Sequence, residues 1–173
     1  VQEAFTLDHR RPVFVKLNDL APDTFYFLDE ITACAIGDAL VEWAARHGGG
    51  RVTVSCSAFG EFQAQQKRLT HLASKFTGLR VLAAGLPANG GSGSRGLEVR
   101  NTRGAPLSRF RVAMREGPAP VLFIARDVSA RSADRGRCVG FMSCGEETID
   151  EIANDLDVAL RGLARRLPTF ERL

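Results

Sequence analysis

The chain has 173 residues and a formal net charge of +3, with 45% hydrophobic and 25% charged residues. This length fits one domain that needs no disulfide to stabilise its core, and the composition is ordinary for a globular protein. The longest apolar runs are far too short to span a membrane, and the first residues lack the pattern of a signal peptide. We therefore expect a cytoplasmic protein, or a plastid stromal one if a transit peptide has been removed.

The first elements are an arm and a helix. Residues 1–12 show no clear period, and VFVKLN from Val13 reads as a short strand or an extended segment, so we assign 1–20 to an N-terminal arm. From Thr24 to Arg46 apolar residues recur at helical spacing, and Pro22 suits an early helical position. Gly48 to Gly50 supply the cap and the turn that follow.

The next stretch predicts the core of the fold. RVTVSCS from Arg51 and LRVLAAG from Leu79 are short apolar runs typical of strands buried on two faces. Between them, Phe62 to Phe76 form an amphipathic helix, with Gln66 on its apolar side and Gln65 and Arg68 on its polar side. Two buried strands joined by a helix predict a right-handed parallel crossover.

The second half reads as strands followed by one helix. LEVRN, RFRVAM, PVLFIARDV and RCVGFMSC predict four strands, and Ser143 with Glu146 offers a capping box for a helix that continues to about Arg166. We predict a single α/β domain over 21–168, with a C-terminal tail at 169–173. Its mixed sheet has about five or six strands, one parallel βαβ crossover and a more antiparallel second half, flanked by about three helices.

No catalytic constellation stands out. Gly91 to Gly96 match G-x-G-x-x-G, but a strand-like run follows them where a dinucleotide fingerprint needs a helix. His47 and the glycines after it resemble an esterase oxyanion loop, yet the chain lacks a G-x-S-x-G elbow, so a helix cap suffices. We expect a protein that is not an enzyme, with no catalytic residues and with its cofactor unknown.

The cysteines predict no metal site. None of the four forms a C-x-x-C pair, and we expect buried free thiols in a reducing compartment rather than a disulfide or metal ligands. Cys138 and Cys144 lie six residues apart with no histidine nearby to complete a tetrahedral set. These four residues are Cys34, Cys56, Cys138 and Cys144.

Arginines are concentrated between Arg95 and Arg137. Such a stretch can face an anion, an acidic protein or, less favoured here, a nucleic acid, although a solvated surface is the simpler interpretation. In RFRVAM the alternation predicts that Phe110 and Val112 point to the core and that Arg109 and Arg111 point outward.

A binding site is expected where the first core strand ends, because ligands often bind at the carboxyl ends of parallel strands. The candidates are one thiol, three side chains of the following helix, and two arginines for an anion. They are Cys56, Phe59, Phe62, Gln66, Arg109 and Arg111.

The order of elements resembles the DICT sensory domain, a family found beside diguanylate cyclases and two-component histidine kinases. The resemblance covers roughly Leu28 to Leu163. It lies in LDEITACAIGDALVEWA, SAFGEFQAQQKRLTHLA, RVLAAGLP, APLSRFRVAM, PVLFIARDV and RCVGFMSCGEETIDEIA. Two departures are the lack of an output domain and a long arginine-rich loop from Ser129 to Arg137.

This resemblance implies a non-catalytic sensory domain that binds a small ligand or a signalling partner and passes a signal to an output domain or a separate chain. The alternative that we keep open is a docking subunit of a larger complex, with the N-terminal arm and the arginine-rich half as its contacts.

Overall fold

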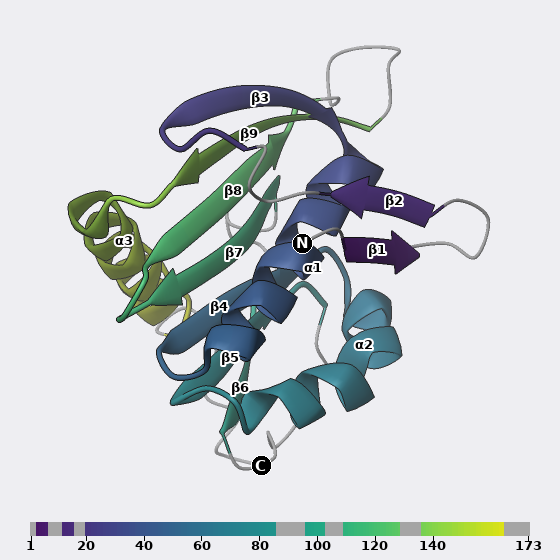
Figure 1. Ribbon diagram of the computed structural model, residues 1–173. Helices are drawn as coiled ribbons and strands as arrows, with labels where there is room; N and C mark the ends of the chain where they lie inside the picture. The colour runs from purple at the N-terminus through teal and green to yellow at the C-terminus, as the bar shows by residue number, and fades with distance from the viewer. Residues whose placement is uncertain are drawn as a thin grey trace.

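The computed structural model describes residues 3–6, 12–15, 20–85, 96–102, 109–128 and 136–164. Within these residues the chain forms a seven-stranded sheet, a separate two-stranded hairpin and three helices (Figure 1). Helices α1 and α2 cover one face of the large sheet, and α3 covers part of the other. The prediction of a single α/β domain with a mixed sheet is confirmed.

The large sheet has the strand order β3-β9-β8-β7-β4-β5-β6. Its strands, in that order, are β3 (Thr24–Asp29), β9 (Arg137–Ser143), β8 (Val121–Asp127), β7 (Phe110–Glu116), β4 (Arg51–Cys56), β5 (Gly78–Ala83) and β6 (Leu97–Asn101). The β4–β5 and β5–β6 pairs are parallel and the other pairs are antiparallel. The sequence predicts the β4–β5 crossover and a more antiparallel second half, but not the parallel pairing of β6 with β5.

The helices bury their apolar stripes against this sheet. Helix α1 (Glu30–His47) packs on β7, β8 and β9 and reaches β4, while α2 (Phe59–Ala73) packs on β4 and β5. Helix α3 (Glu146–Ala164) lies on the opposite face, against β7 and β8. The α2 crossover between two parallel strands is the one that the sequence predicts.

The start of α1 differs from the prediction. We expected a helix from about Thr24, but 24–29 form edge strand β3, which pairs antiparallel with β9. Tyr26 and Leu28 pack on the core and alternate with exposed Phe25 and Phe27. Burial therefore repeats every two residues, as in a strand, rather than every 3.6 residues, as in a helix. Strand β9 lies more than a hundred residues further along the chain, and local spacing carries no information about such a partner.

The N-terminal arm also contains structure. Strands β1 (Glu3–Thr6) and β2 (Pro12–Val15) form an antiparallel hairpin beside α1, which confirms the short strand predicted near Val13 and corrects the expectation of a structureless lead-in. With seven strands in the large sheet and two in the hairpin, the predicted count of five or six strands was too low. All but the last residue of the G-x-G-x-x-G segment lie outside the described residues, as do most of the arginine-rich loop and the C-terminal tail.

Arg115 on β7 is buried, with 2% of its surface exposed. Its guanidinium donates to the carbonyls of Gly48, at 2.6 Å, and Ala119, at 3.1 Å, and lies 5.5 Å from the centre of the Trp43 ring. A cation at the carbonyl end of a helix is favoured by the helix dipole, so Arg115 holds the end of α1 against the β7–β8 turn. Strand arginines were expected on a solvated surface, and Arg115 is an exception.

The glycines after α1 serve the turn rather than an oxyanion loop. Gly49 and Gly50 have φ values of 63° and 74°, which favour glycine. A Cβ on Gly50 would lie 2.5 Å from the Glu116 carbonyl oxygen, whereas a Cβ on Gly49 would meet nothing within 4 Å. The turn therefore needs glycine at Gly50 for two reasons, conformation and close approach to β7.

This pair of glycines gives a matched test of the close approach. Gly49→Ala should lower the free energy of unfolding by about 1–2 kcal/mol, the cost of a left-handed conformation with a Cβ. Gly50→Ala adds a clash with backbone and should lower it by at least about 2 kcal/mol more. Urea unfolding followed by circular dichroism measures both values, and equal losses in the two variants would contradict the tight β4–β7 approach.

Candidate functional site

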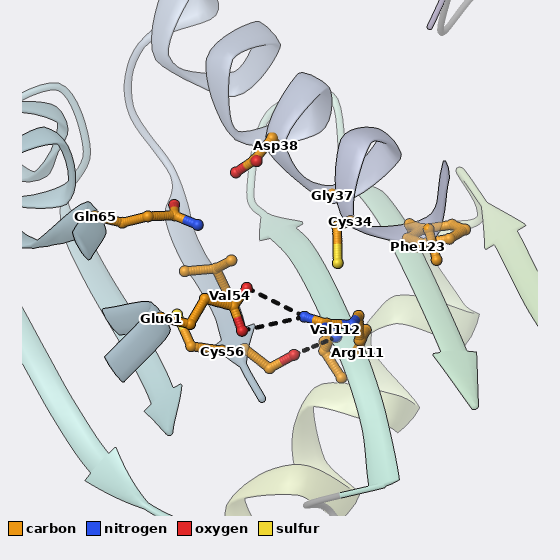
Figure 2. Close-up of a pocket in the computed structure, with 12 residues that line it drawn as sticks. Cys34, Gly37, Asp38, Val54, Cys56, Glu61, Gln65, Arg111, Val112 and Phe123 are labelled. Carbon is orange, nitrogen blue, oxygen red and sulfur yellow. Dashed lines mark hydrogen bonds and ion pairs between the residues drawn. The ribbon is translucent and has the colours of Figure 1, made fainter. Parts of the chain in front are cut away.

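The candidate site is a crevice between α1 and α2 at the carboxyl end of β4 (Figure 2). Its volume is about 20 Å³, which is room for about one water molecule. The polar and thiol side chains that line it come from both helices and from the two strands beneath them. They are Cys34, Asp38, Ser55, Cys56, Glu61, Gln65 and Arg111.

The crevice begins where the β4–β7 ladder stops. The last paired residues are Val54 and Ala113. Beyond them the Ser55 hydroxyl takes the place of the ladder, accepting from the Val112 amide at 2.7 Å and donating to the Phe110 carbonyl at 3.3 Å. The Ser55 hydroxyl thus satisfies hydrogen-bonding groups of the β7 backbone beyond the point where the pairing of β4 with β7 ends.

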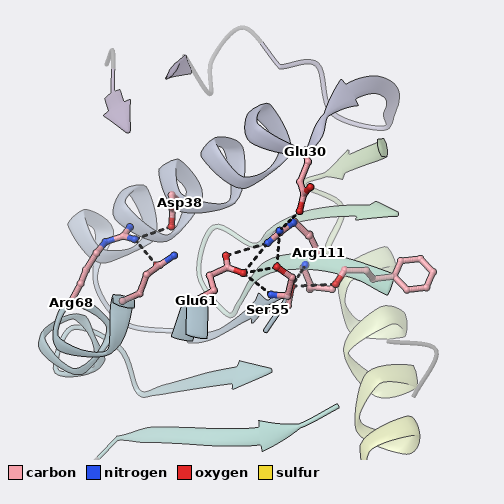
Figure 3. Close-up of polar contacts among 10 residues, drawn as sticks. Glu30, Asp38, Ser55, Glu61, Arg68 and Arg111 are labelled. Atoms are coloured by element: carbon pink, nitrogen blue, oxygen red, sulfur yellow. Dashed lines mark hydrogen bonds and ion pairs between the residues drawn. The ribbon is translucent and has the colours of Figure 1, made fainter. Parts of the chain in front are cut away.

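Arg111 lies on the helix-covered side of β7 and connects both helices (Figure 3). Its Nη2 donates to Glu30 Oε1 of α1 at 2.8 Å and to Ser57 Oγ at 2.9 Å, and its Nη1 is 3.2 Å from Glu61 Oε1 of α2. Glu61 in turn accepts from the amide and the hydroxyl of Ser57, both at 2.7 Å. The predicted outward orientation of Arg111 was wrong, because an opposite charge from each helix makes its burial favourable.

A second arginine connects the same helices further along. Arg68 of α2 donates to Asp38 and Glu42 of α1, both at 2.8 Å, and to Gln65 at 3.0 Å. It was predicted on the solvated side of α2, and instead it lies between the helices. The seam between α1 and α2 is therefore ionic, with Arg111 over the end of β4 and Arg68 beside Asp38.

Burial and neighbouring charges shift the pKa values of these groups in opposite directions. Burial by itself lowers the pKa of the Arg111 guanidinium, but the nearby Cys34, Glu61 and Glu30 outweigh it and the pKa is raised. Burial raises the pKa of the Asp38 carboxyl, and the Arg68 charge offsets only part of that rise. The Arg111 cation is permanent, so the charge state of this crevice is set by its acidic neighbours.

Two thiols flank Arg111. Burial raises the pKa of Cys34 to about 12 and that of Cys56 to about 12, and the Arg111 charge lowers each only in part. At neutral pH both groups are therefore thiols rather than thiolates, which makes them poor nucleophiles and poor metal ligands. In Figure 2 the Cys34 sulfur points from α1 toward the strand that carries Arg111.

The structure brings together only some of the predicted binding residues. Cys56 and Arg111 line the crevice. Phe59 and Phe62 pack into the apolar core under α2, and Gln66 is exposed. Arg109 is exposed and does not line the crevice.

Sequence reasoning missed the acidic half of the site. Glu30, Asp38 and Glu61 were not singled out. Glu30 and Glu61 each lie in the first turn of a helix, where the helix dipole alone favours acidic side chains, so their positions gave no signal of a site. On α2, Gln65 rather than Gln66 faces the crevice, which is an error of one position in helical phase.

A larger hollow lies at the other end of α1. It has a volume of about 440 Å³ and mostly apolar walls. The residues that line it are Leu20, Leu40, Trp43, Ala119, Pro120, Val121, Met142 and Cys144. Its volume suits a small molecule, but none of these described lining residues is charged and able to fix one.

Across the described ranges, no group of three or more His, Cys, Asp or Glu side chains is arranged to hold a metal ion. None of the helices described is long and apolar enough to cross a membrane.

No protein-family model matches the chain, and no curated protein matches it in sequence. Among solved structures it is similar to the crystal structure of polyphosphate kinase from Porphyromonas gingivalis, with a TM-score of 0.47 and 14% sequence identity. That similarity covers 79% of this chain, which spans 23% of the kinase chain. A similarity at this level does not establish a shared fold or activity.

The raised thiol pKa values predict slow labelling in the crevice. With Ellman's reagent at pH 8, Cys144, which is exposed, should react in a fast phase. Cys34 is partly exposed but should react slowly because its raised pKa keeps it a thiol, and the buried Cys56 and Cys138 should react only as fast as the protein opens. Cys144→Ser should remove the fast phase, and unfolding in urea should release the other thiols. A fast phase that persists in Cys144→Ser and maps to Cys34 would show that the crevice is open in solution.

Proposed function

We propose that this chain is a sensory or regulatory module that binds a small acidic ligand at Arg111. The observation that carries the proposal is that one cation, whose side chain is only 16% exposed, is shared between carboxylates of two different helices, Glu30 and Glu61. Ligand binding in this position would change how α1 and α2 are held together. The resemblance to DICT sensory domains, a family that no matching family model supports, predicts the same role.

The two carboxylates hold Arg111 unequally. The Glu61 side chain is 23% exposed and is fixed by Ser57, whereas the Glu30 side chain is 56% exposed. Exposed ion pairs contribute only about 0–1 kcal/mol, so an incoming anion displaces Glu30 at little cost. A phosphate or carboxylate group could then accept from Arg111 as a charge-assisted partner.

Displacement of Glu30 would transmit the signal. The Glu30–Arg111 pair lies at the start of α1, and the Arg68 pairs with Asp38 and Glu42 hold the helix further along. Loss of the first contact with retention of the second allows the start of α1 to move relative to α2. The ligand shifts this equilibrium only by the difference in its affinity for the two arrangements.

A second function, docking to another chain, is favoured by a different observation. Phe25 and Phe27 on edge strand β3 are 69% and 89% exposed, although both are large apolar residues. Apolar side chains on an unpaired strand edge are typical of protein contact surfaces.

Inorganic phosphate at constant ionic strength is the first probe for the Arg111 site. A concentration ten times the Kd adds about 1.4 kcal/mol of stability, which corresponds to a rise in melting temperature of about 3–6 °C. Arg111→Met should abolish this rise, and Arg109→Met, at an exposed arginine outside the crevice, should keep it. An equal rise in both variants would remove Arg111 from the site.

Replacing the competing carboxylate sharpens the test. Glu30→Gln weakens the contact that the ligand must displace, so phosphate should bind about two- to fivefold more tightly. Glu146→Gln is the matched control, since Glu146 is likewise the exposed first residue of a helix but lies on α3. Isothermal titration calorimetry gives the Kd values, and weaker binding in Glu30→Gln would show that Glu30 supports the ligand rather than competing with it.

A further inference from the structure

We propose that two copies of this chain pair through the free edge of β3, joining their sheets across a two-fold axis. This inference does not depend on the Arg111 site, because it rests on edge strand β3, whereas Arg111 lies on β7 in the interior of the sheet.

The outer edge of β3 has no partner strand among the described residues. Strand β3 pairs with β9 on one side and with no other described strand. The Glu30 amide donates to the Gly136 carbonyl at 2.8 Å, and in an antiparallel ladder the hydrogen-bonding groups of alternate residues face the same neighbour. By that alternation Tyr26 and Leu28 face β9, and the backbone groups of Phe25 and Phe27 face the open edge.

The side chains beside this backbone are aromatic and exposed. Phe25 and Phe27 lie on the face of the sheet that carries α3, but α3 packs against β7 and β8 and leaves β3 uncovered. The Phe25 ring is 4.9 Å from the ring of Phe141 on β9, so the aromatic surface continues inward from the edge. The strand contains no proline, glycine or lysine, which are common devices against edge pairing.

The opposite edge of the same sheet provides a comparison. Strand β6 carries Glu98 and Arg100, which bind each other, and Glu98 also binds Arg80 of β5. Charged side chains on an edge are typical of a strand that stays unpaired. The contrast between the charged side chains of β6 and the aromatic side chains of β3 favours β3 as the edge that pairs with another chain.

A second copy fits this edge because β3 is self-complementary in the antiparallel sense. With Tyr26 opposite Tyr26 on the two-fold axis, Phe25 of one copy lies opposite Phe27 of the other, and both have their backbone groups free. Asp23 and Asp29 meet at the ends of the pairing, but Asp23 accepts from Ser143 and Asp29 from the Thr32 amide of its own copy. The interface uses the same surface twice and therefore closes as a dimer.

Sedimentation velocity at about 100 µM chain tests the proposal. The wild type should sediment at twice the chain mass of 18.8 kDa. Phe27→Asp should sediment as a monomer, because it places a charge at the centre of the interface. Val158→Asp adds the same charge at an apolar residue of α3 that is 57% exposed, and it should stay a dimer.

Two outcomes would overturn the inference: a monomeric wild type at this concentration, or a dimer that survives Phe27→Asp. Phe27 is 89% exposed, so its replacement leaves the core intact, and a wild-type circular dichroism spectrum with cooperative urea unfolding verifies that Phe27→Asp is folded. Loss of the phosphate response with retention of the dimer would instead contradict only the proposed function.

The register has its own test in a Cys144→Ser background. Under mild oxidation a mixture of the Phe25→Cys and Phe27→Cys proteins should form a disulfide-linked dimer, because the two positions face each other at about 5.5 Å between Cα atoms. Either protein alone should give far less of it. Cross-linking that is equal in the mixture and in each protein alone would contradict pairing centred on Tyr26.

Discussion

Strand β4 is the constraint on which the rest of this fold depends. It is the one strand of the described sheet that pairs parallel on one side, with β5, and antiparallel on the other, with β7. Its middle is fully buried, and the bidentate pair between Arg51 and Glu116 closes the start of the β4–β7 ladder. The parallel side requires a crossover helix, while the antiparallel side requires none. Around β4, α2 as the crossover covers the parallel half, and α1 lies mainly over the antiparallel half.

The crevice follows from that arrangement. At the carboxyl end of β4 the chain turns into α2, while α1 lies over the neighbouring β7, and the space outside the carboxyl ends of strands is where open α/β sheets bind ligands. Here the space is nearly filled, because Arg111 extends from β7 to reach carboxylates of both helices. The Arg111 guanidinium connects the two helices by ion pairs rather than by apolar contacts, and its partner Glu30 is more exposed than its partner Glu61. Such a contact is less costly to exchange than an apolar one, since a new anion satisfies the same cation.

Sequence patterns predicted elements whose partners lie near in the chain and failed where partners are distant. The β4–α2–β5 unit was predicted because its strands are apolar, its helix is amphipathic and its crossover is local. Strand β3 was assigned to a helix because Phe27, Leu28 and Ile31 also fit helical spacing, and only pairing with β9 decides between the two periods. For the site, the strand end at Cys56 was predicted from topology. The burial of Arg111 was not predicted, because the two carboxylates that pair with it lie 81 and 50 residues away in the sequence and are common in first turns for other reasons.

The β3 edge and the crevice meet at a single peptide. Asp29 ends β3 and caps α1 through the Thr32 amide at 2.6 Å, and the next residue is Glu30, the exposed partner of Arg111. An interaction that holds β3 in place therefore also holds the first turn of α1. Glu30 lies in that turn, and its carboxylate must move for an anion to reach Arg111. If both proposals hold, a β3 pair that stabilises this turn makes Glu30 harder to displace, and an anion that displaces Glu30 weakens the pair by the same factor. Such reciprocity is required of any two sites joined by one two-state element. The short connection between edge and crevice makes the start of α1 that element.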